Sequence, residues 1–594
     1  MGRQVVSLAL LLGLLGLGLA VVGSARREPA DITFNNFAEV STLDPATVTG
    51  VPEGRVLYAI FEGLCIKHPQ TLEPLPGMAE SWEVSADGLS YVFHLRAEAR
   101  WTNGDAVTAH DFVWAWERFL NPNTGAQYAY QLWYVKGARA YTTEVDDDGQ
   151  PLHSFEAVGI RAADDLTLVV ELEAPTPFFL DIVTFYPLMP VNRRNIEEAQ
   201  ARWPHNWEVA WLRPENLVTN GPFRVVERRI NDRMRLEKFE GYWDADNVAF
   251  DSIDVTATEH YTTSLNLYLT GEIAWIDKIP NNLIPRLLPR EDFNPKPYLG
   301  SYFFRVNVER PPFDDQRVRR ALALTIDRKA ICEKITKSGQ VPSWTFVPPG
   351  LEGYEPVPMD HSPTGDAFAD YDAAFARDCE RAVELFAEAG YGPGGKPLPT
   401  IEIHYNTSET HRDVAEVIAD GWKRLLGVNA KLLNQEWKVY LDTQSGIDYD
   451  VSRSAWIGDY RDANTFLDMF VTGGENNKTG WGNPRYDELI ALAAKEVDQA
   501  RRLAHLAAAE AILMDEVPIL PIYYYVTQNI VNPRLGGFYE NVQDDHLPKF
   551  WYWLSDEELA EKRAQQPPHW ELVDAPGPAE GKYAPSGRRG LGGL

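Results

Sequence analysis

One acidic residue, Asp459, stands inside the mostly apolar and aromatic stretch SRSAWIGDYRDANTFLDMF, residues 452–470. A carboxylate in such surroundings has lost much of its water, and a buried charge without a partner is costly. Asp459 therefore needs a cation. Arg453 and Arg461 are the candidates within the chain, and most buried acids pair internally. A cation carried by a bound ligand is the alternative, and this stretch alone leaves both open.

Catalytic patterns are absent from the sequence. It contains no HExxH, no GxxxxGK[ST] and no GxSxG. His404 and His411 lie seven positions apart, across a predicted strand-to-helix turn, which is a poor spacing for shared metal ligation. We therefore predict a protein that is not an enzyme and carries no cofactor or metal. An exported hydrolase is the disfavoured alternative.

Aromatic residues are numerous, with 18 Trp and 26 Tyr. Several lie beside polar loop residues: Tyr128, Trp437, Trp456, Tyr460 and the run Tyr523 to Tyr525. Aromatic side chains with a polar group suit the walls of a binding site that accepts varied ligands. For each one taken alone, packing in the core is an equally good explanation.

The bulk properties describe a large acidic globular protein. A chain of 594 residues exceeds what one core can organise, so several lobes are expected. The net charge of −30 argues against nucleic acid or an anionic membrane as the main partner, because both require clustered Lys and Arg.

The first 25 residues have the layout of a secretory signal peptide. Arg3 is followed by an apolar run from Val5 to Gly23 and by small residues up to Ala25. An uncleaved membrane anchor is the alternative, because the apolar run is long. We predict a cleaved signal at 1–25 and a periplasmic mature protein.

The chain has three cysteines, Cys65, Cys332 and Cys379. An odd number in an exported protein leaves at least one thiol unpaired or bonded to another chain. Cys332 and Cys379 could form a disulfide, although spacing alone cannot establish the geometry.

Strand, hairpin and helix patterns alternate along the chain. SWEVS and SYVFHLR read as a hairpin with a turn at Ala86-Asp87-Gly88, and Thr108 is the expected N-cap of the helix that follows. Residues 314–335 and 411–427 read as amphipathic helices. This mixture predicts an α/β protein. The segment 556–594 is rich in Gly, Pro and charge and is expected to form a flexible tail beyond a short helix.

Several blocks then occur in a characteristic order. They are AESWEVSADGLSYVFHLRAEARWTNGDAVTAHDFVWAWERFL, TNGPF, DDQRVRRALALTIDRKAI, NQEWKVYLDT, AWIGDY and LPIYYYV. This order resembles that of the bacterial extracellular solute-binding proteins that serve peptide-importing ABC transporters, and most of all their oligopeptide-binding and murein-peptide-binding branches. The resemblance extends from about Phe34 to about Trp553.

The resemblance implies a periplasmic binding protein fold with three domains in two lobes that close on a ligand by a hinge. Domain I would be discontinuous and the hinge would lie near Gly300 and Val526. The expected ranges are 31–61, 192–299 and 527–555 for domain I, 62–191 for domain II and 300–526 for domain III.

The resemblance also suggests a role for Asp459. In the oligopeptide-binding members, the acid of the W-x-x-D-Y block contacts the α-ammonium of the bound peptide, and a carboxylate–ammonium pair of that kind is strong and directional. Val51 and Ala455 match positions that meet the peptide backbone. The matching wall positions are Tyr128, Trp437, Trp456 and Tyr525.

The residues expected around the carboxylate end of the ligand match the family pattern less fully. Arg453 and His411 match two basic positions of the family, whereas a second arginine of the pattern is replaced here by Gln444. An amide can donate a hydrogen bond but supplies no full charge.

The implied function is capture of short peptides in a cleft between the lobes, for delivery to an inner-membrane ABC importer permease. A monomer without nucleic-acid partners is expected. The alternative is the same fold binding another amine-bearing solute, such as a murein peptide, an opine or a dipeptide.

Overall fold

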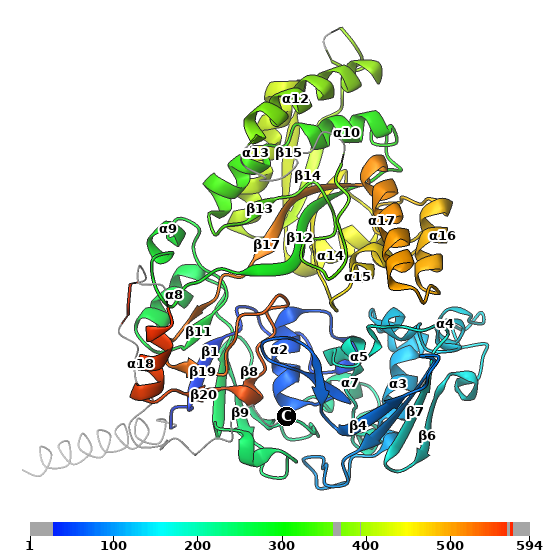
Figure 1. Ribbon diagram of the computed structural model, residues 1–594, viewed down its shortest axis with the longest axis vertical. Coiled ribbons are helices and arrows are strands. Elements are labelled where there is room, and N and C mark those ends of the chain that lie inside the picture. Colours follow the sequence, from blue (N-terminus) through cyan, green and yellow to red (C-terminus); the bar gives the residue numbers. More distant parts are fainter. Residues whose placement is uncertain (1–27, 360–369, 393, 567–570, 574–594) are drawn as a thin grey trace, which may run out of the picture.

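The computed structural model describes residues 28–359, 370–392, 394–566 and 571–573. The predicted signal peptide and most of the predicted C-terminal tail lie outside these residues. Figure 1 shows two lobes, one above the other. We call residues 300–526 the upper lobe and the other described residues the lower lobe. Within the described ranges, no helix has both the length and the apolar character needed to span a membrane.

The upper lobe is built on a six-stranded mixed sheet with the strand order β13-β17-β12-β16-β14-β15. Its strands are β13 (Val341–Pro342), β17 (Ile519–Val526), β12 (Pro297–Val306), β16 (Val451–Ile457), β14 (Ile401–Asn406) and β15 (Ala430–Gln435). β12 pairs antiparallel with β16 and β17, whereas β14 pairs parallel with β15 and β16. Central strands such as β12 are buried on both faces because helices cover the sheet.

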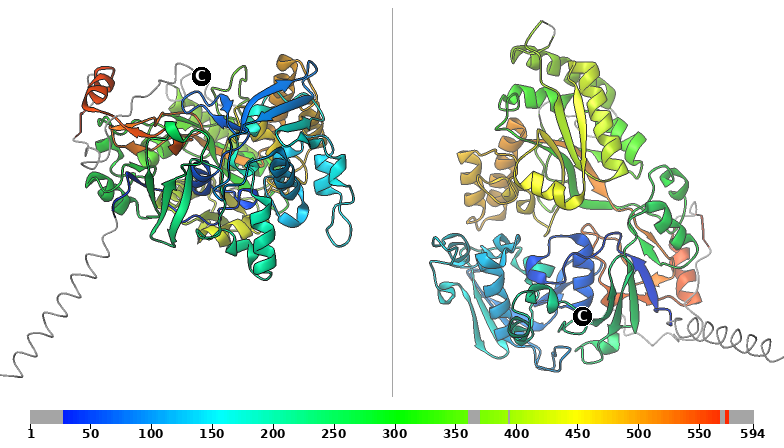
Figure 2. Two further views of the ribbon diagram at one scale, coloured as in Figure 1. Left: turned by 90° about the horizontal axis from the view of Figure 1, so that it is seen from below. Right: turned by 180° about the vertical axis from the view of Figure 1, so that it is seen from behind.

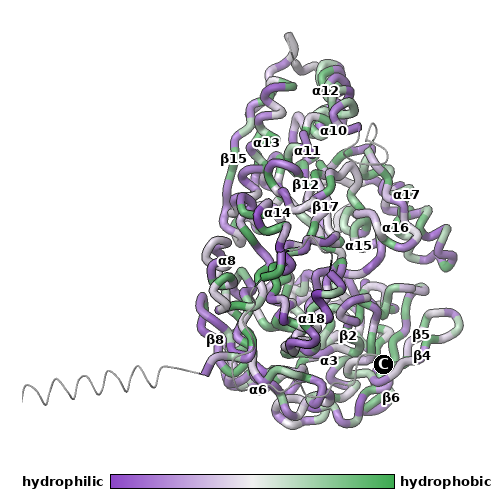
Figure 3. The backbone as a smooth tube through the Cα atoms, turned by 60° about the vertical axis from the view of Figure 1, so that its left-hand side comes forward, coloured by the Kyte–Doolittle hydropathy of each residue, from purple (hydrophilic) through white to green (hydrophobic). Residues whose placement is uncertain are grey.

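Helices surround this sheet, and amphipathic helices occur where they were predicted, at residues 411–427 and in the first part of residues 314–335. The surrounding helices include α10 (Gln316–Leu324), α12 (Tyr371–Glu388), α13 (Glu409–Leu426), α14 (Trp437–Ser445), α16 (Pro484–Ala493) and α17 (Gln499–Glu516). Hydrophilic and hydrophobic stretches alternate along α10, α12 and α13 in Figure 3. Gly427 ends α13 in the left-handed conformation, with φ 71°.

The helix predicted over residues 314–335 is divided in the structure. α10 ends at Leu324, and α11 (Arg328–Ala330) leads into a π-helix, η7 (Ile331–Thr336). The Thr325 hydroxyl bonds back to the Ala321 carbonyl at 3.0 Å, and Asp327 caps the next turn by accepting from the Ala330 N–H at 3.0 Å. Side-chain hydrogen bonds of this kind compete with helix continuation, which explains the break.

The main sheet of the lower lobe collects strands from distant parts of the chain, in the order β18-β11-β1-β10-β9-β8. They are β18 (Ile530–Val531), β11 (Trp275–Ile276), β1 (Ile32–Asn35), β10 (Ser252–Thr256), β9 (Arg233–Lys238) and β8 (Phe223–Arg229). A discontinuous domain I requires such an arrangement, although the domain boundaries themselves stay a prediction. Figure 2 shows this sheet from two further sides.

A second, antiparallel sheet of the lower lobe has the order β4-β5-β7-β6. Its strands are β4 (Ala79–Val84), β5 (Ser90–Leu95), β7 (Thr167–Glu171) and β6 (Ile160–Asp164), and α3 (Ala109–Leu120) packs against β6 and β7. The predicted hairpin is present, with Gly88 at φ 71°. Thr108 caps α3 in a capping box with Asp111, as predicted.

The two chain crossings between the lobes lie side by side. Pro297 of β12 pairs with Val526 of β17, and the Thr527 N–H donates to the Lys296 carbonyl at 2.8 Å. Two adjacent single-chain crossings are the geometry that a hinge needs.

All three cysteines are free thiols, so the possible Cys332–Cys379 disulfide is not formed. No group of three or more His, Cys, Asp or Glu side chains in the described ranges could hold a metal ion.

Candidate functional site

Asp459 lies directly between the two lobes, in the loop after β16. Its Oδ2 accepts hydrogen bonds from Gln131 Nε2 at 2.8 Å and from the Tyr130 hydroxyl at 3.5 Å. Both donors belong to η3 (Ala129–Leu132) of the lower lobe. The Asp459 N–H donates to Thr465 Oγ1 at 3.1 Å, which fixes the loop on the upper lobe. The carboxylate therefore spans the interface.

The internal ion pairs considered for Asp459 are not formed. Arg461 instead pairs with Asp181 at 3.3 Å, and it donates to the Thr71 carbonyl at 3.1 Å. Arg453 points to the hydroxyl of Tyr525. Within the described part of the chain, Asp459 makes no ion pair.

Burial raises the pKa of Asp459 to about 7, although the positive charge of Lys67 and the hydrogen bonds from Tyr130 and Gln131 act in the opposite direction. Lys67 is itself buried and engaged, since its Nζ contacts Asp545 Oδ2 at 2.5 Å. Asp459 lies deep in the interface yet keeps some accessible surface. Part of the Asp459 side chain is therefore within reach of water.

The segment after Asp459 enters the lower lobe. Tyr460 is 1% exposed and belongs to the hydrophobic core of that lobe. Its ring stacks on Phe178, with centroids 4.6 Å apart and an interplanar angle of 6°. The Gly458 carbonyl accepts from Gln543 Nε2 of the lower lobe at 2.9 Å. Contacts on both sides of Asp459 thus hold the lobes together.

Two of the predicted wall residues flank Asp459. Tyr128 packs its ring edge-on against Phe185 at 5.1 Å. Trp456 donates from Nε1 to the carbonyl of Thr465 at 2.6 Å, the residue whose hydroxyl holds the Asp459 N–H. Both aromatic side chains are partly exposed. Asp459, Tyr128, Tyr130, Gln131 and Trp456 form what we call the acidic inter-lobe site.

Arg453 is a buried guanidinium that has no carboxylate partner in the part of the chain that the structure describes. It is 8% exposed, donates to the Tyr525 hydroxyl at 2.8 Å and to Asn406 Oδ1 at 3.3 Å, and lies 4.8 Å from the centre of the Tyr302 ring. Its Nε has no hydrogen-bond partner, and no ion pair of Arg453 occurs among the described residues. Such a group can bind a carboxylate at little further desolvation cost.

His411 lies in the first turn of α13, and its Nδ1 is 3.1 Å from the Tyr302 hydroxyl. Burial, followed by the charge of Arg453, holds the pKa of His411 well below its usual range. The imidazole is therefore neutral and can act only as a hydrogen-bonding group. The preceding residue, Thr410, accepts a hydrogen bond from Asn281 of the lower lobe at 2.8 Å. Arg453, His411, Tyr302 and Tyr525, all of the upper lobe, form what we call the basic site.

The two sites lie along one strand. Arg453 is in the middle of β16 and Asp459 follows its end, so they are separated by roughly 20 Å of extended chain. Ala455 lies between them, opposite Tyr302 in the strand register, and is partly exposed. Val51 begins α2 (Val51–Ile60) of the lower lobe and is 42% exposed.

The side chains of two predicted site residues contact neighbouring groups instead of the side chains of these sites. The amide of Gln444 is buried and donates within its own domain, to Tyr440 Oη at 2.9 Å, Ser452 Oγ at 3.1 Å and the Arg453 carbonyl at 3.0 Å. It supports the Arg453 backbone and has no spare donor for a ligand. Trp437 is 53% exposed and stacks on Tyr440 at 5.5 Å.

Sequence reasoning missed the residues of the lower lobe that face Asp459. Tyr130 and Gln131 stand in QYAYQLWY, where no motif marks them. Tyr58 of α2 was also missed. It is 7% exposed, and its hydroxyl has no hydrogen-bond partner of good geometry among the described residues, although the Tyr186 backbone lies nearby.

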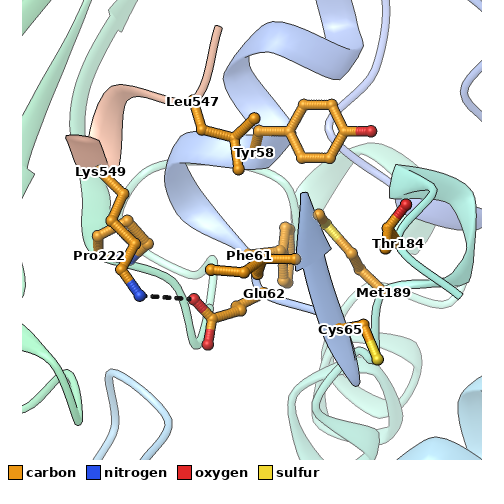
Figure 4. A pocket seen from close by; sticks show the side chains of 10 residues that line it. Tyr58, Phe61, Glu62, Cys65, Thr184, Met189, Pro222, Leu547 and Lys549 are labelled. Carbon is orange, nitrogen blue, oxygen red and sulfur yellow. Dashed lines mark ion pairs between the residues drawn. The ribbon is translucent and has the colours of Figure 1, made fainter. Parts of the chain in front are cut away.

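A small cavity of the lower lobe lies beside Tyr58 (Figure 4). Its volume is about 10 Å³, enough for one water molecule and far too small for a peptide. Lys549 Nζ lies 3.6 Å from Glu62 Oε2 at one end, and the Tyr58 hydroxyl points away from that pair. The cavity therefore belongs to the packing of the lower lobe.

Comparison with known proteins gives consistent matches. The family model described as bacterial extracellular solute-binding proteins, family 5, matches residues 73–478. The chain is 34% identical to the oligopeptide-binding protein OppA of Bacillus subtilis, over 85% of this chain and 89% of that protein. It is 34% identical to the periplasmic murein peptide-binding protein MppA of Escherichia coli, over 88% and 93%.

Comparison with solved structures leads to the same family. Haemophilus influenzae OppA in complex with RPPGFSPFR matches with a TM-score of 0.79 and 32% identity, covering 89% of this chain and all (100%) of that chain. Burkholderia pseudomallei OppA matches with a TM-score of 0.78 and 32% identity, with the same coverage, 89% and 100%. The predicted periplasmic binding protein fold is confirmed, and the chain belongs to family 5 of the bacterial extracellular solute-binding proteins.

Proposed function

We propose that this protein is the periplasmic solute-binding component of an ABC importer and captures short peptides between its lobes. The observation that carries the proposal is Asp459, a carboxylate between the lobes without a cation of its own chain among the described residues. A peptide α-ammonium supplies that cation. Further support comes from relatives whose names describe oligopeptide and murein peptide binding.

The peptide would lie extended along β16, with its amino end at the acidic inter-lobe site and its carboxylate at Arg453. Backbone pairing gives affinity without reading side chains. Val51 and Ala455 are the residues we expect beside the peptide backbone, with Tyr128, Trp456 and Tyr525 as walls of the site.

We also infer that the domain ranges given above hold and that the Lys296–Gly300 and Val526–Thr527 crossings are the hinge. We further propose that the protein delivers the bound peptide to a membrane permease and that it is a monomer.

The proposal is tested by titrating the purified protein, refolded free of any carried ligand, with a tripeptide such as Ala-Ala-Ala. Saturable one-site binding is expected. Binding of a sugar or a metal chelate in preference to every peptide would contradict it.

Peptide affinity should depend on pH. Only the ionised Asp459 pairs with an ammonium group, and its pKa without ligand is about 7. Below pH 7 the carboxylate is increasingly protonated, so the Kd should rise about tenfold for each further pH unit. Calorimetric titration between pH 5 and 7.5 measures this effect.

The matched control is Asp459→Asn, which cannot ionise and should show weak affinity with little pH dependence over that range. A wild-type affinity that stays constant from pH 7 to pH 5 would contradict the pairing of Asp459 with the ligand amine.

The role of Arg453 gives a separate prediction. For a hexapeptide, which in extended form spans roughly 20 Å, replacing the carboxylate by an amide removes the anion that Arg453 would bind. Wild-type affinity should then fall about 10- to 100-fold, as for a charged hydrogen bond. Arg453→Met should lose the discrimination between the acid and the amide. Arg501→Met, at an arginine whose side chain is 70% exposed, is the control and should keep it. If Arg453→Met and wild type discriminate equally between the acid and the amide, another residue binds the peptide carboxylate.

A further inference from the structure

The acidic residues near the inter-lobe interface differ in whether they have a cation. Asp462 pairs with Arg502 at 2.7 Å, Asp181 with Arg461 at 3.3 Å and Asp545 with Lys67 at 2.5 Å. Asp459 has none, and neither has Asp468, within the residues that the structure describes. Both unpaired acids lie in the 452–470 stretch.

Asp468, the first residue of η8 (Asp468–Phe470), is held by neutral groups only. Its Oδ2 accepts from Asn464 Nδ2 at 3.2 Å and from the Tyr460 hydroxyl at 3.4 Å. The same Asn464 amide donates to the hydroxyl of Tyr134 in the lower lobe at 2.7 Å. Asp468 thus ends a hydrogen-bond network that crosses the interface.

The position of Asp468 is similar to that of Asp459. It lies deep in the interface and yet keeps accessible surface. Burial, and then the negative charge of Asp459, raises the pKa of Asp468 to about 8. The two carboxylates are close enough to repel each other, so Asp468 holds its proton more strongly while Asp459 is charged and has no cation. An ammonium group at Asp459 removes this repulsion, and a second ammonium group beside Asp468 would favour its ionised form.

An independent feature of helix α2 in the lower lobe also points to a ligand. The Tyr58 side chain is more than nine-tenths buried, yet its hydroxyl has no hydrogen-bond partner of good geometry among the described residues. The charges that act most strongly on this hydroxyl are those of Asp545 and Asp459. A buried hydroxyl in that field can accept from an ammonium group, which has three N–H donors to satisfy.

We propose that Asp459 and Asp468 together form a subsite for ligands that carry two cations at the amino-terminal residue. The α-ammonium would bind Asp459 and the Tyr58 hydroxyl, and a side-chain ammonium would bind Asp468. The preferred ligands are therefore peptides that begin with lysine, ornithine or another diamino acid. This specificity rests on the proposed peptide-binding function and goes beyond it.

The chemistry favours an amine over a metal ion as the second cation. The described residues contain no group of three or more metal-ligating side chains, and the neighbours of Asp468 are phenols and an amide. A lysine ammonium is a compact charge on a flexible four-carbon stem, which can reach a second acid from the same residue. Asp468→Asn is a matched test because the amide keeps an oxygen for Asn464 and Tyr460 while removing the charge.

The experiment compares Lys-Ala-Ala with norleucine-Ala-Ala, which has a side chain of similar length without the charge. Calorimetry at pH 7.5 and low salt should give wild-type protein at least about tenfold higher affinity for the lysine peptide. Asp468→Asn should bind both peptides within about threefold of each other.

The possible outcomes are distinct. Equal wild-type affinity for the two peptides, or a lysine preference that persists in Asp468→Asn, overturns the subsite and leaves the proposed function standing. Binding of neither peptide to wild type overturns the proposed function as well. If Asp468→Asn does not fold, the wild-type ratio alone decides.

Discussion

Asp459→Asn should weaken the binding of a tripeptide by about 2–4 kcal/mol, or roughly 30- to 1000-fold in Kd. The substitution keeps the size of the side chain and an oxygen to accept from Gln131, but it removes the charge that the ligand ammonium meets. The loss is large because the ammonium would then be held between the lobes without a counter-charge. Calorimetric titration with Ala-Ala-Ala measures it.

Asp372→Asn is the matched control, since the side chain of Asp372 is 86% exposed and lies on the outer helix α12. It should bind the tripeptide as wild type does. An Asp459→Asn variant that folds and binds the tripeptide with wild-type affinity would show that Asp459 does not bind the ligand ammonium group.

Arg502→Met should destabilise the protein by about 3–5 kcal/mol, the usual cost of leaving one partner of a buried ion pair alone. Arg502 Nη1 and Nη2 contact the two carboxylate oxygens of Asp462 at 2.7 and 2.8 Å, and the side chains are 3% and 10% exposed. The guanidinium also lies 5.0 Å from the centre of the Phe178 ring in the lower lobe. Urea unfolding monitored by tryptophan fluorescence measures the loss.

The double variant Asp462→Asn/Arg502→Met is the control. It removes both charges, while the introduced amide keeps an oxygen for the Asn464 N–H, from which Asp462 accepts at 2.9 Å in the native protein. Most of the lost stability should return. A double variant as unstable as Arg502→Met would mean that the arginine acts through packing on Phe178 and not through the charge of Asp462.

The sequence alone allowed some parts of the site to be predicted. A lone acid among aromatic residues marked Asp459, because charge in apolar surroundings is conspicuous in a linear sequence. Local rules also identified the Thr108 capping box and the β4–β5 hairpin, since both depend on residues a few positions apart.

Contacts between distant residues could not be predicted. Gln131 and Asp459 are 328 positions apart, and only the closed arrangement of the lobes brings them to 2.8 Å. Gln444 was placed in the site by its position in a pattern, but its amide turns toward Tyr440 and Ser452 of its own domain. The direction of a side chain depends on packing, which local sequence does not encode. The break after α10 likewise depends on side-chain bonds of Thr325 and Asp327 that compete with a strong helical pattern.

The central claim is that the Asp459 carboxylate pairs with the α-ammonium of the ligand. Its most direct test is a double-mutant cycle that titrates wild type and Asp459→Asn with Ala-Ala-Ala and with its N-acetylated form. The account predicts that acetylation weakens binding to wild type by roughly 30-fold or more but changes binding to Asp459→Asn by less than about threefold. Equal losses on acetylation in the two proteins would contradict it.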